Sequence, residues 1–222
     1  MCGRFTLATS AETLASLFAG LELPPLKPRY NIAPTQMVSC IRAGNDGDVE
    51  YAELRWGLVP SWSKDLKMGA RMINARGETV GEKPAFRSAF KRRRCLILAD
   101  GFYEWKKEDG QKQPYYVTKT DEQPFAMAGL WEVWKNKQTD EVVQSCTIIT
   151  TAANKFMQPL HDRMPVILDA DNRQLWLDKE FEDRSHLESL LQPLAEDALR
   201  KRPVNKIVNR PINDSPECIA PV

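Results

Sequence analysis

Cys2 is the residue with the most specific chemistry in this sequence. Its small side chain predicts that methionine aminopeptidase removes Met1, which would leave a cysteine with a free α-amine and a thiol on adjacent carbons. Such a 1,2-aminothiol condenses with an aldehyde to an imine, and the thiol then closes a five-membered thiazolidine ring. The expected partner of Cys2 is therefore an aldehyde, and the alternative is an incidental cysteine near a terminus.

Three other side chains are candidates for chemistry. Arg4 places a cation two residues from the thiol, where it would hold a phosphate or lower the thiol pKa. Glu104 lies among aromatic residues, where desolvation would let it act as a general acid or base. His161 is better placed than His186, which falls in a charged segment. The alternatives are an exposed arginine, an exposed strand glutamate and a structural histidine.

A basic stripe lies between positions 83 and 94, where six basic residues occur without an acidic one: Lys83, Arg87 and positions 91–94. Aromatic residues, Trp62 and Trp105 among them, lie near this stripe in the sequence. Basic residues interleaved with rings suit a single nucleic-acid strand whose bases stack on the rings. The alternative is a solvated charged face.

Composition excludes several classes of protein. A net charge of +1 and 42% hydrophobic residues in 222 exclude a disordered chain and a generic polycation. Five widely spaced cysteines without a C-x-x-C pair, and only two histidines, predict neither a disulfide framework nor a metal site. No apolar run approaches the roughly 18 residues of a membrane helix, and no secretory signal is evident, so we expect no membrane contact and a cytoplasmic protein.

Short runs of β-branched and aromatic residues predict most of the chain to be strands around a curved antiparallel sheet. The expected hairpins pair 37–42 with 49–56, around Gly44 to Gly47, and 102–107 with 115–119, around Asp109-Gly110. Further strands are expected at 95–99, 125–133, 142–151 and 204–208. Helices are expected after a capping box at Thr9 and Glu12, at 173–177 and at 186–191, with an irregular loop at 24–34. The pattern indicates a single α+β domain.

Ordered blocks of sequence, taken together, resemble the SOS-response-associated peptidase (SRAP) family, the abasic-site processing proteins of bacteria and animals. The resemblance runs nearly end to end. The blocks are MCGRF at 1–5, RYNIAPTQ at 29–36, WGLVPSW at 56–62, INARGET at 73–79, ADGFYEWKK at 99–107, TTAAN at 150–154, HDRMPVIL at 161–168 and VNKIVN at 204–209.

The resemblance implies a twisted, barrel-like antiparallel sheet with peripheral helices, in one domain over residues 1–222. It also implies that an exposed Cys2 forms a covalent thiazolidine with the ring-opened sugar of an abasic site in single-stranded DNA. Asn74 would orient the Cys2 amine or the sugar, and Glu104 would assist ring opening and proton transfer. His161 would handle protons on the aldehyde or imine oxygen and in reversal of the crosslink. Lyase activity and autoproteolytic release of Met1 are further expectations.

DNA binding is likewise implied by the resemblance. Arg4 and Arg76 would bind phosphates beside the lesion, and Trp62 would stack at a junction between single strand and duplex. Ser63 follows Trp62 where relatives often carry a second aromatic residue. The full set of expected DNA-binding residues is Arg4, Asn31, Trp62, Arg76 and Trp105. We expect a monomer without metal or cofactor, associated with the nucleoid when engaged on DNA.

Three alternatives compete with this interpretation. A class II amidotransferase also begins with Cys-Gly after Met1 removal, but it delivers ammonia to a large second domain for which this chain leaves no room. A thiol peptidase built from Cys2 and His161 shares its active residues with the crosslinking reaction, so the sequence does not separate the two. A non-catalytic DNA-binding module is weakened by the coincidence of Cys2, Asn74, Glu104 and His161 in one chain.

Overall fold

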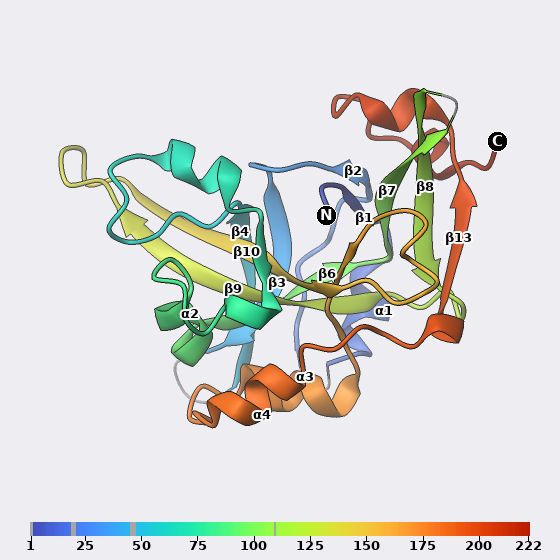
Figure 1. Ribbon diagram of the computed structural model, residues 1–222. Helices are drawn as coiled ribbons and strands as arrows, with labels where there is room; N and C mark the ends of the chain where they lie inside the picture. Colours follow the sequence, from blue (N-terminus) through green and yellow to red (C-terminus); the bar gives the residue numbers. More distant parts are fainter. Residues whose placement is uncertain (1, 19–20, 45–47, 109) are drawn as a thin grey trace.

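The computed structural model of the protein describes residues 2–18, 21–44, 48–108 and 110–222 (Figure 1). The two expected hairpin turns include residues 45–47 and Asp109, which lie outside the described residues. The hairpins that these turns connect are confirmed, with strand pairs running from Met37 opposite Arg55 to Ala43 opposite Val49, and from Gly101 opposite Thr118 to Glu108 opposite Gln111.

A closed ring of strands forms the centre of the molecule. Strands β10, β4, β3, β6 and β9 pair in that order, and β10 pairs again with β9. Every residue of β6 is buried, so both faces of this strand are covered, which agrees with its continuous apolar run. The larger sheet consists of β3 (Met37–Ala43), β4 (Val49–Trp56), β5 (Asn74–Arg76), β6 (Arg94–Ala99), β9 (Phe125–Lys135), β10 (Val142–Ala152), β11 (Arg163–Pro165) and β12 (Ile167–Leu168).

A smaller antiparallel sheet stands beside the ring, upright at the right of Figure 1. This sheet packs on the ring through Phe5, whose side chain meets that of Trp56 edge to face with ring centroids 5.1 Å apart. The strand order is β13 (Leu199–Pro203), β8 (Gln111–Lys119), β7 (Gly101–Glu108), β1 (Phe5–Leu7) and β2 (Arg29–Ile32).

Short helices lie at the periphery, as expected, so the α+β fold with a barrel-like sheet is confirmed. Trp176 of α3 is fully buried and donates its indole N–H to the carbonyl of Cys95 at 3.0 Å, which ties the helix to β6. No helix formed by the described residues is long and apolar enough to cross a membrane. The helices are α1 (Ala11–Ala15), α2 (Arg87–Arg92), α3 (Ala170–Leu177) and α4 (Arg184–Ser189).

Several local expectations are corrected by the structure. The cap of α1 is Ser10 rather than Thr9, because the Ser10 hydroxyl accepts the N–H of Thr13 at 3.4 Å. The 24–34 segment is not wholly irregular, since β2 pairs with β1 there. The last strand is β13 rather than 204–208, where residues 206–209 form a 3-10 turn. Strand β10 also pairs in parallel with β4 and β5, so the larger sheet is mixed.

Part of the basic stripe is engaged in contacts within the protein. Arg94 is 3% exposed and donates to the carbonyls of Trp176, Phe90, Lys91, Asp178 and Phe181, which joins α2, β6 and the end of α3. Arg93 pairs with Glu132 at 2.7 Å. Lys91 and Arg92 pair with Glu182 at 3.0 and 3.3 Å. Residues distant in the sequence thus pair with Lys91, Arg92 and Arg93 and bury Arg94, which the local sequence does not reveal.

Arg94→Ala should destabilise the fold without weakening DNA binding by the folded protein. The change leaves buried carbonyls without donors, and we expect a loss of about 2 to 4 kcal/mol and a melting temperature lower by roughly 5 to 15 °C. Thermal melting measures it against Arg92→Ala, which removes a surface ion pair worth less than about 1 kcal/mol. Equal melting temperatures for the two variants would contradict the structural role of Arg94.

Candidate active site

Pairing of β1 with β7 brings the N-terminal segment to the site. Phe5 lies opposite Phe102, and the N–H of Tyr103 donates to the carbonyl of Arg4 at 2.9 Å. The same register, continued past Phe5, carries the chain toward Cys2 alongside Glu104. Strand β1 is therefore held between β2 and β7.

Strand β5 brings Asn74 to Cys2. The strand runs parallel to β10, with Asn74 opposite Ile148, and the amide Nδ2 of Asn74 donates to the carbonyl of Cys2 at 2.9 Å. The other amide atom, Oδ1, is buried and accepts no hydrogen bond from any described residue. Ala75 is buried between Asn74 and the exposed Arg76, so strand alternation puts Asn74 and Arg76 on the same face.

Cys2 is buried, with 0% of its surface exposed, and it packs in the main hydrophobic core. The expectation of an exposed Cys2 is therefore wrong for the chain that begins at Met1. Burial raises the pKa of the Cys2 thiol, and the nearby Glu104 carboxylate raises it further. The thiol is accordingly held in its neutral form.

Glu104 is a buried carboxyl on β7, 3% exposed, and not the exposed strand residue of the alternative interpretation. Burial raises its pKa above the ordinary value of 4.5, and Asp162 adds to that effect. A raised pKa keeps a carboxyl protonated closer to neutral pH, which suits a general acid.

His161 is a neutral imidazole with its proton on Nε2. Its Nδ1 accepts the backbone N–H of Arg163 at 3.0 Å, which requires a lone pair on that nitrogen. The same Nδ1 lies 2.6 Å from a carboxylate oxygen of Asp162, which would favour a proton there, but that side chain is 84% exposed and well solvated. Burial lowers the pKa of His161 more than Asp162 raises it, so the neutral form prevails.

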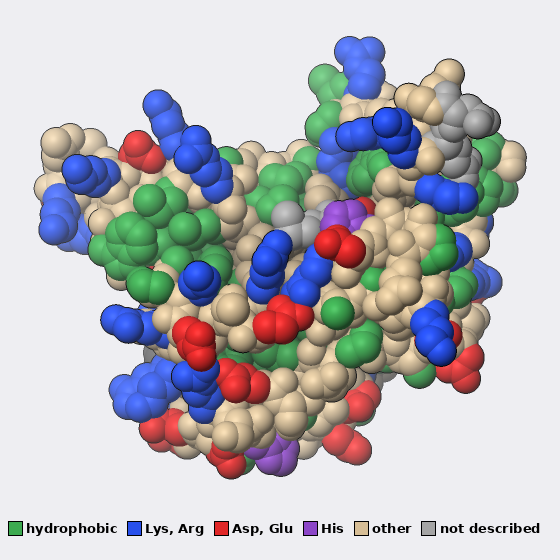
Figure 2. Space-filling view, in the orientation of Figure 1, with side chains coloured by type: hydrophobic (Ala, Val, Ile, Leu, Met, Phe, Trp, Pro, Cys, Tyr) green, Lys and Arg blue, Asp and Glu red, His purple; other side chains and the backbone are tan. Residues whose placement is uncertain are grey.

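Glu104 and His161 both line a cavity of about 520 Å³, whereas Cys2 and Asn74 are not among its lining residues. In Figure 2 the surface is hollowed between the lobe of β9 and β10 and the lobe of β7, β8 and β13, with Lys and Arg side chains on both lobes. The remaining lining residues are Arg4, Trp105, Lys112 and Asn209. The cavity thus combines proton-transfer groups with cations and an aromatic ring.

Arg4 and Asn31 are bonded mainly to the protein itself. The guanidinium of Arg4 donates to Asn31 Oδ1 at 2.7 Å and to the carbonyl of Val208 at 2.9 Å. Asn31 is 0% exposed, and its Nδ2 donates to the carbonyls of Val208, Arg210 and Asn213 at 3.1, 3.1 and 2.7 Å. A direct DNA contact by Asn31 would require those bonds to break, so its place in the site is behind Arg4.

The other expected DNA-binding residues reach the surface. Trp62 is 58% exposed, and the segment that carries it is fixed where Trp134 donates to the carbonyl of Ser63 at 2.8 Å. Arg76 is exposed at the end of β5. Trp105 lines the cavity, with Arg4 5.9 Å from its ring centroid.

Sequence reasoning missed Lys112 and Asn209 as lining residues. Asn209 ends the VNKIVN block, so the resemblance contained the signal without a role for it. Lys112 lies at the start of β8 in a polar hairpin, and no local pattern distinguishes it from other surface lysines.

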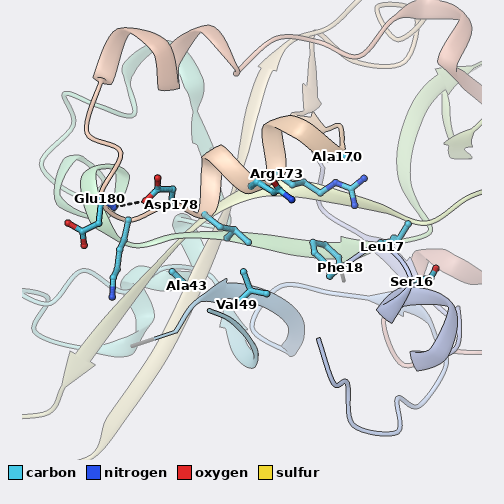
Figure 3. A pocket seen from close by; sticks show the side chains of 12 residues that line it. Ser16, Leu17, Phe18, Ala43, Val49, Ala170, Arg173, Asp178 and Glu180 are labelled. Atoms are coloured by element: carbon cyan, nitrogen blue, oxygen red, sulfur yellow. Dashed lines mark hydrogen bonds between the residues drawn. The ribbon is translucent and has the colours of Figure 1, made fainter. Parts of the chain in front are cut away.

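A second cavity of about 490 Å³ is separate from these residues. It lies between α1, α3 and the β3–β4 hairpin, and Figure 3 shows Arg173 and Phe18 on its walls, with the guanidinium carbon 5.4 Å from the ring centroid. None of the candidate residues lines it, so the active-site assignment does not involve it. Among the described residues no three His, Cys, Asp or Glu side chains are grouped so as to hold a metal ion.

The model of the SOS response associated peptidase (SRAP) family matches residues 1–211. The chain is 44% identical over 224 residues to the abasic site processing protein YoqW of Bacillus subtilis, covering 99% of each chain. It is 34% identical to the abasic site processing protein HMCES of Xenopus tropicalis, covering 88% of this chain and 67% of that protein.

Solved structures show the same architecture. A crystal structure of a protein from Bacteroides thetaiotaomicron superposes with a TM-score of 0.85 at 25% identity and covers both chains completely. A phage-related protein from Bordetella bronchiseptica superposes with a TM-score of 0.74 at 30% identity, covering 91% of this chain and 94% of that one.

Glu104→Gln should stabilise the fold near neutral pH. The folded state raises the pKa of Glu104 above 4.5, so its contribution to stability is present below pH 4.5 and is lost as the pH rises through the folded pKa. Gln stays neutral and keeps the shape. We expect the variant to melt above the wild type at pH 7 to 8, with the gain disappearing below pH 4.5, by calorimetry.

Exposed Glu141→Gln is the control for general effects of pH on the melting temperature. If Glu104→Gln melts below the wild type at pH 7, the charged form of Glu104 stabilises the fold. Its assignment as a proton donor with a raised pKa would then be wrong.

Proposed function

We propose that this chain, which belongs to the SOS response associated peptidase (SRAP) family, captures abasic sites in single-stranded DNA through a covalent bond to Cys2. Relatives at 44% and 34% identity are named abasic site processing proteins, and a ring-opened abasic sugar presents an aldehyde. The observation that carries the proposal is the position of Cys2: a hydrogen bond from Asn74 holds its carbonyl, and its thiol lies near Glu104, which lines a cavity together with His161.

The proposed reaction begins once Met1 is removed and the α-amine of Cys2 is free. The amine attacks C1′ of the open-chain sugar, and loss of one water gives an imine. The Cys2 thiol then adds to the imine carbon while its proton passes to the nitrogen, which closes the thiazolidine. One water leaves and no electrons are exchanged with another molecule, so the reaction needs no cofactor.

Three side chains take proton-transfer and orienting roles in this proposal. Asn74 holds the Cys2 main chain with Nδ2, and its unpartnered Oδ1 is an acceptor for the amine or a sugar hydroxyl. Glu104, with its raised pKa, donates a proton to the sugar ring oxygen as the ring opens. His161 presents Nε2–H to the aldehyde oxygen, which leaves as water when the imine forms, and returns a proton when the crosslink reverses.

DNA binding in this proposal uses cations and rings around the cavity. Arg4 supplies positive charge at the lesion, and Arg76 binds a flanking phosphate from the face that also carries Asn74. Trp105 stacks in the cavity, and Trp62, being 58% exposed, stacks at the junction of single strand and duplex. One chain supplies every residue, so a monomer suffices.

A thiol peptidase built from Cys2 and His161 is the second candidate, and the electrostatics disfavour it. Such an enzyme needs a thiolate, stabilised by a lowered thiol pKa and an adjacent imidazolium. Here burial raises the pKa of Cys2 and lowers that of His161. Within the described part of the chain, the Cys2 thiol donates to the carbonyl of Arg4 at 3.9 Å and not to His161. Attack by the amine first is compatible with a neutral thiol.

Cys2→Ser and Cys2→Ala should both lose the heat-stable adduct. Serine keeps the amine but closes a far less stable oxazolidine, and alanine has no group to close a ring. Affinity for the DNA should be retained, because the phosphate-binding side chains are unchanged. The measurement is a denaturing gel of heated mixtures with abasic single-stranded DNA, beside a binding assay.

Cys218→Ala is the matched control, since Cys218 is also a buried free cysteine but lies in the C-terminal segment. It should crosslink at the wild-type rate. A heat-stable adduct formed by Cys2→Ala would show that another residue captures the sugar.

Arg76→Ala should weaken the dependence of DNA binding on salt. Each phosphate contact to a single strand contributes a slope of about −0.7 in log affinity against log salt, so the variant should lose about one such contact. Exposed Arg87→Ala, in α2, should leave the slope unchanged. Equal slopes for Arg76→Ala and the wild type would remove Arg76 from the DNA interface.

A further inference from the structure

The C-terminal segment builds one wall of the cavity, and Asn209 is its exposed polar residue there. The segment is held in place from behind, because Asn31 donates to the carbonyls of Val208 and Arg210. Asp214 fixes its far end by accepting the N–H of Asn31 at 2.9 Å. Asn209 therefore sits on a braced turn, the 3-10 turn Lys206–Asn209, and not on a loose tail.

The amide of Asn209 has a defined orientation. The indole N–H of Trp105 donates to Asn209 Oδ1 at 2.7 Å. Because an indole nitrogen only donates, Oδ1 must face Trp105, and the NH₂ group must face away from it. That NH₂ group makes no hydrogen bond to any residue that the structure describes, and the side chain that carries it lines the cavity.

The cations that line the cavity attract an anion, but they do not supply all the hydrogen bonds that an anion can accept. Arg4 directs three hydrogen bonds at protein oxygens, namely Asn31 Oδ1 and the carbonyls of Val208 and Asn209. Its charge attracts an anion, but most of its donors are already used. Lys112 adds a second cation to the same cavity. Besides the Nε2–H of His161, which the proposed reaction uses, an anion drawn there meets an oriented and available neutral donor in the NH₂ group of Asn209.

We propose that Asn209 binds the DNA strand directly, with its Nδ2 donating to a non-bridging phosphate oxygen next to the abasic nucleotide while its Oδ1 holds Trp105 in place. This inference rests on the proposed function and adds a contact that orients the strand. The positive charge of Arg4 and Lys112 favours phosphate over an uncharged sugar hydroxyl as the acceptor.

The test is a double-substitution cycle between Asn209→Ala and single phosphates of the DNA. A single strand carrying a tetrahydrofuran abasic analogue has no aldehyde, so equilibrium affinity is measured without crosslinking. Methylphosphonates replace the phosphates around the analogue one at a time. We expect one position at which the methylphosphonate costs the wild type about tenfold more affinity than it costs Asn209→Ala, because the variant keeps the attraction of the cations but has no Asn209 hydrogen bond left to lose.

Asn205→Ala is the matched control, since Asn205 caps the same turn by accepting the N–H of Ile207 at 2.9 Å but does not line the cavity. It should behave as the wild type at every phosphate. If Asn209→Ala lowers affinity by the same factor at every position, the proposal is overturned and Asn209 acts only by holding Trp105. Crosslinking of authentic abasic DNA through Cys2, measured separately, tests the proposed function on its own.

Discussion

The pairing of three-residue β1 between β2 and β7 is the interaction on which the site depends. The proposed chemistry needs a cysteine at the very end of the chain, whereas chain ends normally fray. Backbone bonds from β7 and β2, and the amide of Asn74, hold the segment from Cys2 to Leu7 as firmly as an internal strand. Cys2 is thereby held near Glu104, which lines the cavity, before any substrate arrives.

Buried polar groups around that segment carry a cost in stability. Glu104 is 3% exposed and Asn74 keeps an amide oxygen without a partner among the described residues. Both features destabilise the folded state relative to apolar replacements, and the closed ring with its buried strands compensates. Such local exceptions to polar satisfaction are expected where a site must bind and move protons.

The sequence alone predicts elements whose pattern is local. Hairpins 37–56 and 101–119 and the strands β6, β9 and β10 follow from apolar and β-branched runs, and they are confirmed. The sequence alone does not predict the partners of Arg94, because two of the accepting carbonyls belong to Trp176 in α3 and to Phe181, both distant in the sequence. Nor does it predict the burial of Cys2, since β1 is too short to identify by periodicity. The bond between Asn74 and Cys2, and the shared cavity of Glu104 and His161, depend on strand pairings across the chain, so only the family resemblance suggested them.

The most direct test of capture by the Cys2 aminothiol is an intact mass of wild-type protein mixed with an oligonucleotide bearing one abasic site, denatured and treated with iodoacetamide. Five free cysteines are present, and ring closure would protect Cys2 alone. We expect the chain without Met1 plus the oligonucleotide minus one water, carrying four carbamidomethyl groups. An adduct that retains Met1, or one that carries five such groups, would contradict a thiazolidine at Cys2.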